Sequence, residues 1–138
     1  MGCRFTQYDI MRLREKREEF QAAGAQLFVV IQSPVKTVEE HFDTSLLDMT
    51  LLCDPESRLY QRFSVLPAQS EEEMHGKHFF EKIKKVEAAG LVGGKKEGIA
   101  WQLPAAFIID PQNTVIYSYY GKEAADMPEP EQLLEVMK

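Results

Sequence analysis

Hydrophobic residues along this chain alternate between helical spacing and short continuous runs. A helix is predicted over 5–23, with Ile10, Leu13 and Phe20 near one face. The segment 25–31 is a nearly continuous apolar run, which is typical of a strand buried on both faces of a parallel sheet. The first elements are therefore a helix and then a buried strand.

The rest of the chain continues this alternation. We predict helices over 35–42, after Asp54-Pro55, over 77–89 and after Pro130, and strands over 50–53, 105–110 and 114–120. Asp54 is predicted as the N-cap and Pro55 as the first residue of its helix. The polar segment 67–76 is predicted to be a surface loop with no packing role. This order predicts an α/β sheet that is parallel at first and ends in an antiparallel β-hairpin covered by a C-terminal helix.

Composition excludes several classes of function. The 138 residues are 44% hydrophobic, which suits a single domain over 1–138. With 16 basic and 22 acidic residues the net charge is −6, so we expect no nucleic-acid or membrane partner. No apolar run approaches the roughly 20 residues of a membrane span, and no signal-peptide pattern is present, so a cytoplasmic location is expected.

The two cysteines are the main candidates for chemistry. Cys3 immediately precedes the first predicted helix, where the helix dipole and unpaired N–H groups are expected to lower a thiol pKa below roughly 8.5. An exposed, incidental thiol is the alternative. Cys53 ends a predicted strand at the same sheet edge, and it is a candidate resolving cysteine if the two Cα atoms lie within about 7 Å. Its alternative role is an inert core residue.

Other motifs are incomplete. His75 and His78 lack the further ligands of a metal site, and the segment 90–96 lacks the spacing of a phosphate-binding loop. We therefore interpret 90–98 as a flexible loop and expect no metal and no cofactor.

Four segments together resemble a known family. They are Gly2-Cys3-Arg4-Phe5-Thr6-Gln7, Leu52-Cys53-Asp54-Pro55, Leu103-Pro104-Ala105-Ala106-Phe107-Ile108-Ile109-Asp110-Pro111, and Tyr119-Tyr120-Gly121-Lys122 running into Pro128-Glu129-Pro130-Glu131. Their order and spacing resemble thioredoxin-like proteins of the alkyl hydroperoxide reductase and thiol-specific antioxidant family, in its peroxiredoxin-like branch. The resemblance implies a three-layer α/β/α sandwich with parallel strands and a C-terminal antiparallel β-hairpin.

The resemblance places the first active-site cysteine of the family at Cys3. Thr6 stands where dithiol members have a second cysteine, so the motif is a one-thiol C-x-x-T variant. A lone thiolate stops at a mixed disulfide or a sulfenic acid, and an external thiol reductant must then resolve it. The Thr6 hydroxyl is expected to donate a hydrogen bond to the Cys3 sulfur and favour the thiolate.

The resemblance also implies a substrate-docking segment before the strand at 105–110. Leu103-Pro104 matches a cis X-Pro pair that positions backbone for an extended thiol substrate, and Trp101 is expected to wall that groove or to be part of the core. The arginine of typical two-cysteine peroxidases is absent from Pro104-Ala105-Ala106-Phe107-Ile108-Ile109-Asp110. Thiol–disulfide chemistry therefore fits these residues better than peroxide reduction.

One strand of the implied fold has no residues here. The strand that delivers the cysteine lies, in the thioredoxin fold, between those at 25–31 and 105–110. An empty slot exposes two strand edges. Three outcomes are possible: a natural chain that starts before Met1, direct pairing of the two edges, or a partner chain in the gap. We expect a shortened start as the origin and a homodimer as the physical remedy.

Two functions follow from these residues. The first is a thiol–disulfide oxidoreductase or peroxiredoxin-like antioxidant protein that uses Cys3 on a disulfide or peroxide. The alternative is a catalytically silent thioredoxin-like binding module or an N-terminally truncated fragment.

Overall fold

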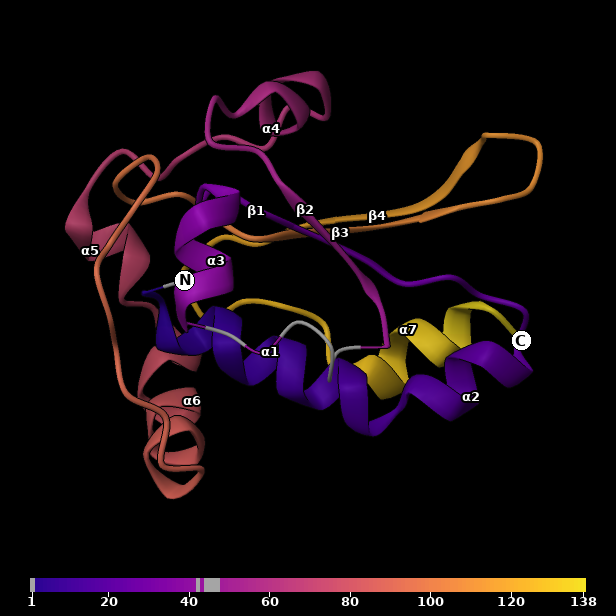
Figure 1. Ribbon diagram of the computed structural model, residues 1–138, viewed down its shortest axis with the longest axis horizontal. Helices are drawn as coiled ribbons and strands as arrows, with labels where there is room; N and C mark the ends of the chain where they lie inside the picture. Colours follow the sequence, from indigo (N-terminus) through magenta and orange to yellow (C-terminus); the bar gives the residue numbers. More distant parts are fainter. Residues whose placement is uncertain (1, 42, 44–47) are drawn as a thin grey trace.

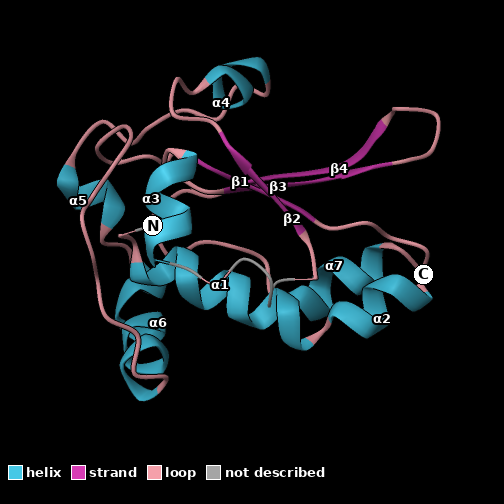
Figure 2. Cartoon of the chain, in the orientation of Figure 1, coloured by secondary structure: helices cyan, strands magenta, loops and turns pink. Residues whose placement is uncertain are grey.

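A computed structural model of the chain describes residues 2–41, 43 and 48–138 (Figures 1 and 2). Its helices are α1 (Arg4–Glu15), α2 (Arg17–Ala22), α3 (Val35–His41), α4 (Arg58–Arg62), α5 (Glu71–Met74), α6 (Lys77–Ala88) and α7 (Pro130–Val136). Its strands are β1 (Phe28–Ile31), β2 (Thr50–Cys53), β3 (Ala105–Ile109) and β4 (Val115–Tyr120). In Figure 1, α1, α2 and α7 lie along one side of the strands and α4 lies on the opposite side.

The long N-terminal helix is divided in two. Lys16 ends α1 and precedes α2 with φ −102° and ψ 8°, which is outside regular helical geometry. Ile10 and Phe20 are buried as predicted, one in each helix. The predicted strand at 25–31 begins later, at Phe28, and the helix predicted to end at residue 42 runs to His41, with residue 42 outside the described part of the chain.

Asp54 caps α4 from a greater distance than predicted. The helix begins at Arg58, not at Pro55, after a turn that places Ser57 in the left-handed region at φ 57°. Asp54 Oδ1 accepts a hydrogen bond from Arg58 N at 2.9 Å, and Oδ2 accepts one from Leu59 N at 2.8 Å. Each oxygen of the carboxylate thus accepts a hydrogen bond from one backbone N–H at the start of α4. Asp54 caps the helix although it lies four residues before Arg58, because the intervening turn brings its side chain back to the helix start.

The segment 67–76 is not the featureless loop that was predicted. It contains α5, whose N-cap Ser70 accepts a hydrogen bond from Glu73 N at 3.3 Å. It also has a packing role, since Ala68 is buried and its N–H donates to Trp101 O at 2.8 Å. The acidic run masked this short helix, because Ser70 and Glu73 form a capping pattern without any apolar periodicity.

The strands form two separate two-stranded sheets. β1 pairs with β2 in parallel, from Phe28 opposite Thr50 to Ile31 opposite Cys53. β3 and β4 form the predicted antiparallel hairpin, with Ala105 opposite Tyr120. The prediction of one continuous sheet is wrong for the described residues, and so is direct pairing of β1 with β3, because no strand occupies the position that would join them. The parallel sheet and the hairpin are compatible with a thioredoxin-like α/β fold, while the three-layer sandwich remains a prediction.

One edge of β1 and one edge of β3 are therefore left without a strand partner. The carbonyls of Leu27 and Ile31 accept hydrogen bonds from the β2 side, so the alternate residues Phe28 and Val30 direct their backbone groups away from β2. The Pro104 carbonyl accepts from Gly121 N at 2.8 Å, so the backbone groups of Ala105 face away from β4 by the same alternation.

Helix α4 and the residue after it connect the two sheets. Tyr60 Oη donates to the Val30 carbonyl at 3.0 Å, which satisfies one acceptor on the open edge of β1. The ring of Phe63 packs against that of Phe107 in β3, with centroids 4.9 Å apart. Tyr120 Oη in β4 donates to the Phe63 carbonyl at 2.7 Å. One short helix thus fixes both sheets without any hydrogen bond between their strands.

The most compact part of the core lies between α1 and α6. Phe5 and Tyr8 of α1 pack with Val86 of α6 and with Ala125, and Phe79 meets Phe5 edge-on at a centroid distance of 5.3 Å. The predicted helix at 77–89 is confirmed with one residue fewer, and its apolar stripe faces α1 as its spacing indicates. Among the described residues, no helix is long and apolar enough to cross a membrane.

Candidate functional site

Cys3 is the residue that immediately precedes α1. Its backbone is extended, with φ −80° and ψ 118°, and its carbonyl accepts the hydrogen bond from Gln7 N that closes the first turn. The side chain is exposed and makes no capping hydrogen bond. The first turn contains no acidic residue, so no carboxylate competes with a thiolate for the positive end of the helix. The predicted placement of Cys3 at the helix start is confirmed.

Thr6 lies in the first turn of α1, three residues after Cys3. No hydrogen bond joins its hydroxyl to the Cys3 sulfur in the part of the chain that the structure describes, contrary to expectation. Sulfur is a weak acceptor, and the exposed Cys3 side chain is turned to solvent, so this contact is not formed.

The segment Trp101–Pro104 adopts a different conformation from the one predicted. No cis peptide bond occurs among the described residues, so Leu103–Pro104 is trans, the isomer favoured in the absence of tertiary enforcement. Trp101 has φ 62° and is 45% exposed, which excludes a core role for its ring. Its carbonyl is engaged by Ala68 N. Within the part of the chain that the structure describes, no hydrogen bond, ion pair or ring contact joins this segment to Cys3 or Thr6, so the two remain separate candidates.

Cys53 ends β2, as predicted, opposite Ile31. It is half-buried and free, and Cys3 is also free, so the two form no disulfide in this structure. Burial raises the pKa of the Cys53 thiol, and the nearby Glu39 carboxylate acts in the same direction. These surroundings suit an inert thiol better than a nucleophile.

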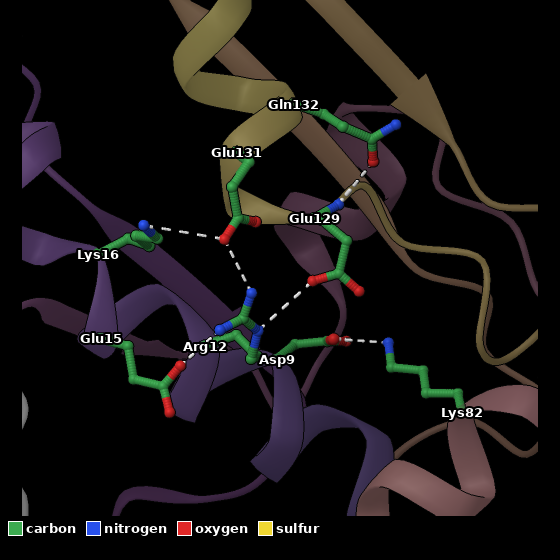
Figure 3. A network of polar contacts seen from close by, with 8 residues as sticks. All are labelled: Asp9, Arg12, Glu15, Lys16, Lys82, Glu129, Glu131 and Gln132. Atoms are coloured by element: carbon green, nitrogen blue, oxygen red, sulfur yellow. Dashed lines mark hydrogen bonds and ion pairs between the residues drawn. The ribbon is translucent and has the colours of Figure 1, made fainter.

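A polar network fixes α1 to the helices around it (Figure 3). Lys82 of α6 is almost completely buried, and its Nζ lies 2.5 Å from Asp9 Oδ1 of α1. The same ammonium lies 5.8 Å from the ring centroid of Phe5 and 5.7 Å from that of Tyr8. Both aromatic faces stabilise the cation, so Lys82 completes the interface between α1 and α6.

The solvent-facing half of this network joins α1 to α7. Arg12 contacts Glu15 at 2.5 Å, Glu131 at 2.8 Å and Glu129 at 3.5 Å. Hydrogen bonding to Glu15 is the main reason that the pKa of Arg12 is raised. Glu129 caps α7 in a reciprocal box with Gln132. The helix that begins after Cys3 is therefore held from two sides.

Sequence reasoning missed Asp9, Lys82 and Arg12 as positioning residues. Lys82 had a local signal, since it stands among Phe79, Ile83 and Val86 on the apolar stripe of its helix. A cation on such a stripe needs a partner when it is buried. The partner, 73 residues away, has no local signal.

The Asp9–Lys82 pair predicts a pH dependence of stability. Burial raises the pKa of Asp9 above its usual 3.8, although the ion pair with Lys82 acts in the opposite direction. Because the folded chain then binds this proton more tightly than the unfolded chain, the contribution of Asp9 to stability is fullest below pH 3.8. It is lost as the pH rises through the raised, folded pKa.

We compare the free energies of unfolding of the wild type and of the variant Asp9→Asn. The stability advantage of the wild type is expected to fall as the pH rises from 3.8 through the raised pKa of Asp9. Urea unfolding at successive pH values measures the difference. A difference that grows with pH would contradict the assignment.

Comparison with known proteins bears on this site. A model of the AhpC/TSA antioxidant enzyme family matches residues 12–123. The chain belongs to this family. The search of curated proteins and the search of solved structures each found no significant match. As in the AhpC/TSA family generally, the expected chemistry is antioxidant thiol chemistry. The match includes Cys53 and the segment Trp101–Pro104, whereas Cys3 and Thr6 precede it.

Proposed function

We propose that this AhpC/TSA family member is a thiol oxidoreductase that uses Cys3 as its single nucleophile. The observation that carries the proposal is the position of Cys3. It is exposed, directly precedes a helix of 12 residues, and has no hydrogen bond that occupies its sulfur as a helix cap. Negative charge is favoured at this end of a helix, and the thiolate is the reactive form of cysteine.

The reaction follows from one thiol. With a disulfide substrate, the Cys3 thiolate attacks one sulfur, a mixed disulfide forms, and the other sulfur leaves as a thiolate. With a peroxide, the thiolate attacks one oxygen, the O–O bond breaks, and the products are Cys3 sulfenic acid and water or an alcohol after protonation. From the mixed disulfide, an external thiol attacks the substrate sulfur, so that the Cys3 thiolate leaves and a new external disulfide forms. From the sulfenic acid, a first external thiol attacks the Cys3 sulfur and releases water, and a second thiol attacks the non-protein sulfur of the resulting mixed disulfide and releases the Cys3 thiolate.

Other residues have supporting roles in this proposal. The proposal assigns substrate docking to the exposed Trp101 ring and to the Leu103-Pro104 backbone, here trans, on the basis of the family resemblance and not of a contact with Cys3, and Thr6 lines the helix start. Cys53 is the candidate resolving thiol in the chain, although its partial burial favours an external thiol. Turnover of a small disulfide and of hydrogen peroxide by the wild type and by Cys3→Ser tests the role of Cys3. Loss of both in the variant is expected, and unchanged turnover contradicts the proposal.

A second proposal concerns the partner of this chain. It would hold equally if the chain were a catalytically silent binding module. We infer that the chain forms a homodimer through its open strand edges. Within residues 2–41, 43 and 48–138, one edge of β1 and one edge of β3 have no strand partner, and exposed apolar side chains lie on the strands at Phe28, Ile109 and Ile116. Unpaired strand edges with apolar flanks favour association with another chain.

Sedimentation equilibrium tests the homodimer. We expect a dimer at micromolar concentration, and Phe28→Asp is expected to shift the equilibrium towards monomer because it places a charge at the edge of β1. Lys36→Glu, an exposed change on α3, is the control. A wild-type monomer at every concentration would contradict the inference.

A further inference from the structure

The loop between α6 and β3 lies against the residue before Cys3. Gly94 N donates a hydrogen bond of 3.1 Å to the Gly2 carbonyl, and Gln7 Nε2 donates one of 3.3 Å to the Val92 carbonyl. A Cβ placed on Gly2 would lie 2.2 Å from the Lys95 carbonyl oxygen, so only glycine fits there. Figure 1 shows this loop rising past the N-terminal end of α1. The loop is thus attached to the start of the helix at several points.

These contacts bring a loop segment with two lysines against the residue before Cys3, which is itself followed by an arginine. Arg4 follows Cys3 directly, and its side chain lies beside Gly93 of the loop, while Lys95 and Lys96 are exposed on the loop itself. Within the described part of the chain, none of the three has an ion pair with a carboxylate. In a protein of net charge −6, such a group of cations is a local reversal of sign.

The nearest acidic residue along the loop is otherwise engaged. Glu97 Oε2 accepts a hydrogen bond from Thr37 Oγ1 of α3 at 3.1 Å. Hydrogen bonds to this carboxylate, despite partial desolvation, lower the pKa of Glu97, so it remains ionised and directed to α3. Since no carboxylate of the described residues forms an ion pair with Arg4, Lys95 or Lys96, these cations are available to an anion from solution.

We propose that Arg4, Lys95 and Lys96 form a cationic docking site that selects anionic co-substrates for Cys3, namely small thiols and disulfides that carry carboxylates. The inference rests on the proposed use of Cys3 as a nucleophile and adds the class of molecule that reacts with it. The cations raise the local concentration of an anionic disulfide and stabilise the leaving thiolate after Cys3 attacks the other sulfur. The S–S bond of the substrate breaks as the bond to Cys3 forms, so electrons balance without a further reagent.

The test compares two disulfide probes in a Cys53→Ser background, where Cys3 is the one remaining cysteine of the chain. Dithiobis(nitrobenzoate) carries a carboxylate on each half, and dithiodipyridine is neutral. The measured quantity is the ratio of their second-order rate constants with Cys3. The variant is Lys95→Glu with Lys96→Glu, and the matched control is Lys84→Glu with Lys85→Glu, an exposed pair on α6 with the same change in net charge.

We expect the ratio of anionic to neutral rate constants to fall about threefold to tenfold in the loop variant at low ionic strength, and added salt to reduce the wild-type ratio. The control is expected to change it by less than about twofold. An unchanged ratio in the loop variant, or an equal change in the control, overturns the docking site. Failure of the proposed function gives a different result from failure of the docking site. If Cys3 is not the nucleophile, turnover is unchanged in Cys3→Ser, whatever the ratio of the two probe rate constants.

Discussion

Replacement of Cys3 by serine is expected to reduce disulfide and peroxide turnover by at least about a thousandfold, because the variant lacks the proposed sulfur nucleophile at the start of α1. A serine hydroxyl has nearly the same size and can cap the helix, so the fold is expected to remain. Steady-state turnover with a dithiol reductant measures the effect, and the urea midpoint of the variant establishes that it is folded.

Cys53→Ser is the matched control for this experiment. Cys53 is half-buried at the end of β2, where burial raises its thiol pKa, so its replacement is expected to leave turnover within about twofold of the wild type. If Cys53→Ser instead abolished turnover while Cys3→Ser did not, the nucleophile would be Cys53. Loss in both variants would identify Cys53 as the resolving thiol, which would form a disulfide with Cys3 that the external dithiol then reduces.

Replacement of Asp9 by alanine is expected to lower the free energy of unfolding by about 3 kcal/mol at neutral pH. The Lys82 side chain is only 9% exposed, so the variant leaves its charge buried without a carboxylate. Removal of one partner of a buried pair is costly even where the intact pair contributes little. Burial raises the pKa of Asp9 even though Lys82 lies beside it, so the intact pair is expected to contribute little net stability.

The double variant Asp9→Leu with Lys82→Met distinguishes these effects. Both charges are absent and similar volume is kept, so its stability is expected within about 1 kcal/mol of the wild type. Glu131→Ala, which breaks a solvent-exposed contact with Arg12, is expected to cost less than about 1 kcal/mol. Urea unfolding measures the free energy of unfolding of each of the three variants. A double variant as unstable as Asp9→Ala would show that the pair has a stabilising role beyond charge compensation.

Elements defined by local spacing could be predicted from the sequence. The stripe of Phe79, Ile83 and Val86 predicted α6, and the short apolar run Thr50–Cys53 is β2 without any change of bounds. The hairpin was also predictable, because Asp110 and Asn113 form a tight turn in which Asp110 Oδ1 accepts hydrogen bonds from Gln112 N and Thr114 N.

Elements that depend on competing local interactions were less predictable. The chain leaves helical geometry at Lys16 although neither glycine nor proline stands there. Asp54 caps a helix that starts four residues later, because its two oxygens reach two N–H groups across a turn. Such choices are decided by small differences in free energy, which periodicity does not contain.

The candidate site shows the same division. The sequence indicated Cys3 as the residue before a helix, and the structure confirms that position. It did not indicate the attachment of Gly2 to Gly94, which joins segments 92 residues apart in sequence, or the pairing of Asp9 with Lys82. Nor did it indicate that the Leu103–Pro104 peptide bond is trans.

The sequence by itself determined the types and order of most helices and strands, the membership of the AhpC/TSA family and the choice of Cys3 as the candidate nucleophile. Only the tertiary structure decided that β1 and β3 stay in separate sheets, that an ion pair with the buried Lys82 fixes α1, and that a loop bearing Lys95 and Lys96 lies against the residue before Cys3. The physical reason is the distance along the sequence over which each interaction acts. Spacing reports which face of one element is apolar, whereas pairing, burial of charge and local potential depend on the path of the backbone between distant residues.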